Sequence, residues 1–126
     1  MDYRTLFERV HSRPGLFGLD GSYGQFSAYV DGVDTGNAGR LLTGFREWLV
    51  TRLGDGDNLV WRGLVLRLAF PDASSIRPEV LSDVELNRTA VDALFALLDE
   101  FLALTERGGA LVQVYDDYLS WRKAPS

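Results

Sequence analysis

Cysteine is absent from this chain of 126 residues. Its absence excludes disulfides, thiolate metal sites and cysteine nucleophiles. No apolar run approaches the roughly 20 residues that a membrane-spanning helix needs. The charged opening segment, 1–10, also lacks the apolar stretch of a signal peptide. We therefore expect a soluble, cytoplasmic protein.

Histidine is nearly absent as well, because His11 is the only one. A metal site would then need carboxylate ligands. The segment DGDN at 55–58 begins like a calcium-binding loop, but the twelfth position is Leu66 and not a glutamate. Phosphate-binding loops and nucleophile elbows are also missing. We expect no metal, no other cofactor and no catalysis.

The residues that are present have the proportions of a folded domain, with 46% apolar, 25% charged and 12% aromatic residues. The length fits one domain over 1–126. The formal net charge is −5. This charge disfavours binding to nucleic acid or to an anionic membrane, because phosphates are neutralised by an excess of Lys and Arg. It favours a basic protein partner.

Apolar residues recur at helical spacing through most of the chain. The pattern predicts an all-α fold, an irregular bundle of five to six helices. The expected helices are one that ends near Ser12, one capped by Asp20 or Ser22, one over 37–53, one over 58–70, one capped by Asn87 or Thr89 and stopped at Gly108–Gly109, and one that begins near Leu111.

Segment 58–70 is ambiguous, because its apolar residues fit both the alternation of a strand and the spacing of a helix. A strand needs a partner, and the chain contains no second clear strand. We therefore favour a buried helix capped by Asp57 or Asn58. After it, 71–78 is expected to be a loop, and Pro78 and Glu79 to open a short helical turn.

The stretch HSRPGLFG, 11–18, raises the question of catalysis because it contains the single histidine. A histidine general base needs a nucleophile or an orienting carboxylate. Ser12 is adjacent, and adjacent helical residues diverge. We interpret the stretch as a structural corner, in which Leu16 and Phe17 enter the core and His11 is a helix-end residue without a partner.

Recognition of a partner is better supported by the later part of the chain. Segment 79–106 holds seven acids and one base, and VYDDYLSW, 114–121, places two aspartates between tyrosines. Tyrosine is enriched at interfaces, and acids attract a basic surface. The candidate partner-binding residues are Asp92, Asp99, Glu100, Tyr115, Asp116, Asp117 and Tyr118.

Three short motifs resemble a family of small bacterial proteins. They are RPGLFG at Arg13–Gly18, GFREWLVTRLG at Gly44–Gly54 and LFALLDEFL at Leu94–Leu102. The family, with its RPGMY-G and GF-EWV--R-G patterns, is similar to immunity partners of polymorphic or contact-dependent toxins. Here Leu16–Phe17 replaces the more usual Met-Tyr. The resemblance implies a non-catalytic protein that binds and neutralises one cognate toxin.

An immunity-type inhibitor of a basic toxin domain, for instance a nuclease, is accordingly the leading hypothesis. Two alternatives remain open. One is a small-molecule sensor or carrier with an aromatic pocket between helices. The other is an enzyme that uses His11 with a carboxylate from a distant part of the chain.

Overall fold

The computed structural model describes residues 2–73 and 81–124, and these residues form six α-helices and the 3₁₀ turn η1, with no strand. The all-α prediction is confirmed. The elements are α1 (Tyr3–Ser12), η1 (Pro14–Phe17), α2 (Tyr23–Gly36), α3 (Phe45–Leu53), α4 (Trp61–Ala69), α5 (Val84–Thr105) and α6 (Ala110–Lys123).

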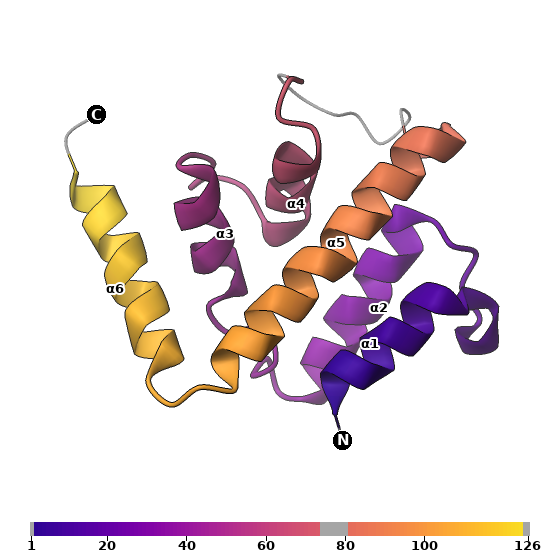
Figure 1. The fold of residues 1–126 in the computed structure, drawn as a ribbon, viewed down its shortest axis with the longest axis horizontal. Coiled ribbons are helices and arrows are strands. Elements are labelled where there is room, and N and C mark those ends of the chain that lie inside the picture. Colours follow the sequence, from indigo (N-terminus) through magenta and orange to yellow (C-terminus); the bar gives the residue numbers. More distant parts are fainter. Residues whose placement is uncertain (1, 74–80, 125–126) are drawn as a thin grey trace.

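The long helix α5 is the centre of the arrangement (Figure 1). Helices α1 and α2 pack on one side of it, and α4 packs on the other. Helix α3 packs against α4, and α6 packs chiefly against α3 at the edge of the molecule. One side of α6 therefore faces away from the other helices.

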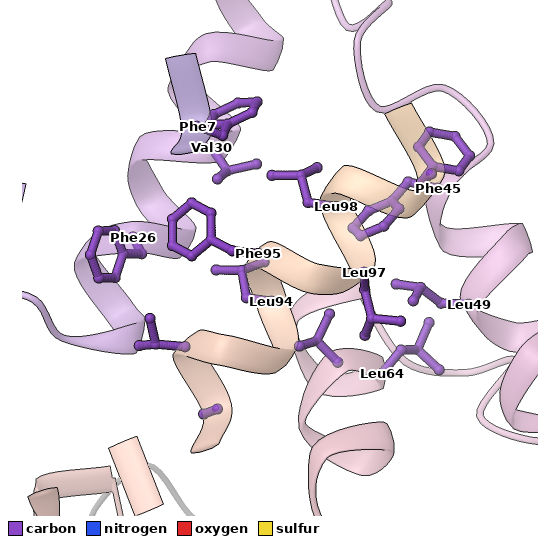
Figure 2. Packing of buried hydrophobic residues seen from close by; sticks show 14 of the residues in the cluster. Phe7, Phe26, Val30, Phe45, Leu49, Leu64, Leu94, Phe95, Leu97 and Leu98 are labelled. Carbon is purple, nitrogen blue, oxygen red and sulfur yellow. The ribbon is translucent and has the colours of Figure 1, made fainter. Parts of the chain in front are cut away.

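The core follows from the apolar stripes of α5 (Figure 2). Phe95 meets Phe26 of α2 edge to face, with ring centroids 4.9 Å apart. On the other flank Phe101 lies 5.1 Å from the ring of Phe45 in α3. Leu98, between them, is fully buried. Each such side chain contributes about 1.5–3 kcal/mol when removed from water, so α5 joins both halves of the bundle.

The corner after α1 has the expected shape, with one correction. Helix α1 ends at Ser12, and Gly18 turns the chain with a left-handed φ of 73°. Phe17 packs against Tyr29, with ring centroids 6.0 Å apart. Leu16, expected in the core, is 71% exposed. Successive side chains of a 3₁₀ turn diverge by about a third of a circle, so Leu16 and Phe17 cannot both face the core.

Two predicted helix starts need correction. Helix α3 begins at Phe45 and not at Asn37, because Ala38, Gly39 and Gly44 have left-handed φ values of 57°, 74° and 86°. Segment 58–70 contains helix α4, as favoured, but its N-cap is Val60 without a side-chain cap. The expected caps lie too early in the chain.

Helix α5 also begins earlier than predicted. Its N-cap is Asp83, whose Oδ1 accepts a hydrogen bond from Leu86 N at 3.1 Å. Asn87 instead accepts from Tyr23 N at 2.9 Å, and the Thr89 hydroxyl donates to a backbone carbonyl. Of the two caps proposed for α2, the helix uses Ser22. The loop expected at 71–78 and the turn at Pro78 and Glu79 lie largely or wholly outside the described residues.

Candidate functional site

The seven candidate residues lie on α5 and α6, in three different surroundings. Asp92 and Asp99 border α1, while Glu100 and Asp117 lie on either side of α3. The remaining three, Tyr115, Asp116 and Tyr118, lie on α6. The structure therefore does not gather all of them into one patch.

Asp99 is held by an arginine of α1. Arg4 donates to its carboxylate from Nε at 2.8 Å and from Nη2 at 3.3 Å, and Glu106 lies 3.7 Å from Arg4 Nη1. The hydrogen bond to Asp99 raises the pKa of the Arg4 guanidinium above its ordinary value. A basic partner would compete with Arg4 for this carboxylate.

His11 has a partner, contrary to the expectation from the sequence. Its Nε2 lies 3.2 Å from Oδ1 of Asp92, and its ring stacks on Phe95 with centroids 4.4 Å apart and planes within 8°. This is the distant carboxylate that the enzyme alternative required. The neighbouring Ser12 hydroxyl, however, donates to the Arg9 carbonyl, so it is not oriented toward His11 as a nucleophile.

Glu100 and Asp117 lie near the same arginine of α3. Arg52 Nη1 donates to Glu100 Oε1 at 2.6 Å, and the guanidinium lies 5.1 Å from the ring centre of Trp48. Arg52, Trp48 and Asp117 line a hollow of about 150 Å³ between α3 and α6. Asp117 also accepts from Gln113 Nε2 at 2.8 Å. Both acids therefore have partners within the chain.

Tyr118 has a structural position. Its hydroxyl donates to Asp57 Oδ1 at 2.5 Å, which ties α6 to the turn before α4. Arg46 also binds Asp57, through the carboxylate at 3.4 Å and through the backbone carbonyl. The hydrogen bond from Tyr118, followed by that from Arg46, lowers the pKa of Asp57 below its ordinary value. Tyr118 is half-buried and engaged, so a partner cannot use it freely.

The outward side of α6 carries a different set of side chains. Val112 is 67% exposed, Leu119 46% and Tyr115 38%, and they recur at i, i+3 and i+7. Half of the large exposed apolar side chains in the described residues lie on this one helix. Asp116 lies among them, and its carboxylate has no hydrogen bond or ion pair with a described residue. We call Val112, Tyr115, Asp116 and Leu119 the outer face of α6.

Sequence reasoning found two members of the outer face and missed two. Tyr115 and Asp116 are among the candidate residues, whereas Val112 and Leu119 are not; the buried residues of α6 are Ala110 and Val114. Val112 was not singled out. Val112 is an apolar residue outside the apolar stripe of its helix, and such a residue is exposed when the helix lies at the edge of the bundle. Partial burial, and then the charge of nearby Glu47, raise the pKa of Tyr115.

Within residues 2–73 and 81–124, no group of three or more His, Asp or Glu side chains could hold a metal ion. None of the described helices is long and apolar enough to cross a membrane. No protein family model, curated protein or solved structure matches the chain.

Proposed function

We propose that this protein is an immunity-type inhibitor that binds a basic toxin domain stoichiometrically, through the outer face of α6. The observation that carries the proposal is the exposed apolar and aromatic stripe on that helix. Val112 and Leu119 are 67% and 46% exposed. A partner that covers the stripe removes this apolar surface from water. The burial favours binding by a free energy of about 25 cal/mol for each Å² of apolar surface.

The charge of the stripe supports a basic partner. Asp116 is exposed between the apolar side chains and has no ion pair among the described residues, so an incoming Lys or Arg need not displace an internal cation. In contrast, Asp99 and Glu100 already bind Arg4 and Arg52. We therefore assign direct contact to the outer face of α6, and long-range attraction of the partner to the net charge of −5.

A toxin whose substrate is nucleic acid would present such a basic surface. Inhibition then requires only that the bound protein cover that surface, with no chemistry by the inhibitor. A second candidate function, binding of a small ligand between helices, is favoured by the cleft between α1 and α5.

Co-expression tests the proposal. The toxin domain encoded beside this chain's gene should arrest growth, and this chain should restore it and form a one-to-one complex. Asp116→Lys should lose rescue, because the reversed charge repels a basic partner. Glu85→Lys is the matched control, since Glu85 is also exposed and has no ion pair among the described residues. Equal rescue by both variants, or no complex with the wild-type chain, would refute the proposed function.

A further inference from the structure

Helices α1 and α5 form a ladder of facing side chains. On α1 the side chains of Arg4, Glu8 and His11 recur at i, i+4 and i+7, on one face. Arg4 pairs with Asp99, and His11 pairs with Asp92. The two partners are seven residues apart on α5, in antiparallel order. Both outer rungs of the ladder are therefore closed, one by the Arg4–Asp99 ion pair and the other by the contact between His11 Nε2 and Asp92 Oδ1.

The middle rung is open. The antiparallel register sets Glu8 against Ala96, which lies between Asp92 and Asp99 on the same face of α5. Ala96 offers only a methyl group, and the Glu8 carboxylate has no hydrogen bond or ion pair with a described residue. Both residues line a cleft of about 410 Å³ between the two helices. The place where Glu8 lacks a partner on α5 is therefore also part of the open cleft.

The floor of the cleft is apolar. Phe7 and Leu102 line it, and so does Phe95, on which the His11 ring is stacked. The floor side chains are almost wholly buried, with 3–7% of their surface exposed, and therefore present a fixed surface rather than mobile groups. An occupant would place an apolar stem on this floor and a polar head at the rim.

The carboxylates at the rim of the cleft favour a positively charged head group. Three carboxylates, of Glu8, Asp92 and Asp99, face one guanidinium, and Arg4 is already bound by Asp99 and Glu106. A head placed between Glu8 and Asp92 would therefore meet one carboxylate without an ion pair among the described residues, and a second, Asp92, whose partner is the His11 ring. A metal ion does not fit, because no group of three suitable ligands exists among the described residues. An organic cation can instead use hydrogen bonds and its own stem.

We propose that this cleft is a binding site for an alkylguanidinium or alkylammonium group. The cation lies between Glu8 and Asp92, and the stem lies beside Ala96 over Phe95. The group can belong to a free amine or guanidine, or to an Arg or Lys side chain of a protein. The site does not depend on the outer face of α6, which is on another helix.

The single histidine makes the test specific, because the His11 imidazole resonances report on the cleft alone. We expect propylguanidinium to shift them in a saturable way, and the neutral isostere propylurea to leave them unshifted. The exposed residue Ala96 allows a steric block without a change of charge. Glu8→Gln should raise the dissociation constant at least fivefold, and Ala96→Met should abolish the shift.

Ala28→Met, on the exposed side of α2, is the steric control and should bind like the wild-type chain. The thermal midpoint of each variant verifies that it folds. A shift that does not saturate, that propylurea reproduces, or that persists unchanged in Glu8→Gln and Ala96→Met would overturn the proposal.

A second arm identifies the source of the cation. If a protein partner supplies it, Glu8→Gln should weaken the complex with the toxin domain as well as the binding of propylguanidinium. If a free small molecule supplies it, Glu8→Gln should lose propylguanidinium binding and leave the complex intact. The only lysine, Lys123 on α6, provides a separate reporter. The resonance of its ¹³C-dimethylated side chain should respond to the toxin domain and not to propylguanidinium. Lys123 therefore reports on the proposed function and His11 on the proposed cleft site, so the failure of one is distinguished from the failure of the other.

Discussion

Gly44 controls how α6 sits on α3, and replacing it with alanine is a direct test of that packing. Gly44 is the N-cap of α3 and has a φ of 86°. A Cβ atom at this position would lie 2.9 Å from Leu111 Cδ2, 3.6 Å from Val114 Cγ1 and 3.7 Å from Tyr115 Cε2. All three neighbours belong to α6, the helix that carries the proposed binding face.

Two effects set the magnitude of Gly44→Ala. A left-handed backbone costs an alanine about 1–2 kcal/mol. The Leu111 methyl must also move, and an off-rotamer side chain costs about 0.5–1.5 kcal/mol. Together they lower the free energy of unfolding by about 1.5–3.5 kcal/mol. With an unfolding entropy of about 2.1 cal/mol/K per residue, the thermal midpoint should fall by about 6–13 °C.

Calorimetry against a matched control separates the two effects. Gly18 has a similar φ of 73°, but a Cβ atom there would meet nothing within 4 Å. Gly18→Ala should therefore show only the backbone effect, and a fall of about 4–8 °C. Combining Gly44→Ala with Leu111→Ala should destabilise less than the sum of the two single changes. If Gly44→Ala equals Gly18→Ala and the double variant is additive, α6 does not contact Gly44 as described.

Two further predictions concern stability. Asp83→Ala should lower the free energy of unfolding by about 1 kcal/mol in urea, because it removes the cap of α5, whereas Thr89→Ala should change it by less than about 0.5 kcal/mol; the reverse order would place the helix start at Thr89. Burial raises the pKa of Tyr23 above its ordinary value of 10, so the unfolded state ionises first as the pH rises above 10. Stability should then fall by up to about 1.4 kcal/mol per pH unit for this group, and Tyr23→Phe should remove that share of the slope in urea melts between pH 9 and 11.

Helical periodicity predicted the fold class because the buried stripes are long, as on α5, where Leu94, Leu98 and Phe101 lie on the core side. Helix starts were harder to predict, because several residues near each start could cap it. Thr89 and Asp92 have the spacing of a capping box, yet Asp83 caps the helix. Asn87 bonds to α2 instead, and no local pattern can reveal a contact between residues 64 positions apart in the chain.

Candidate site residues were predicted by charge and residue type, and these properties do not reveal internal partners. Asp92, Asp99 and Glu100 are acids on an exposed face, as expected, but each has a partner on another helix. The sequence predicts no partner for His11, because Asp92 is 81 residues away in the chain. Exposure of Leu119 follows from the position of α6 at the edge of the bundle, which its own sequence does not encode.

The outer face of α6 is tested most directly by the affinity for the purified toxin domain, measured by titration calorimetry on two matched variants. Leu119→Glu places a charge in the apolar stripe. Val84→Glu makes the same kind of change at an apolar residue of α5 that is 72% exposed. We predict that Leu119→Glu loses at least about 2 kcal/mol of binding free energy, about 30-fold in affinity, while Val84→Glu stays within twofold of wild type. Equal affinity of the two variants would contradict it.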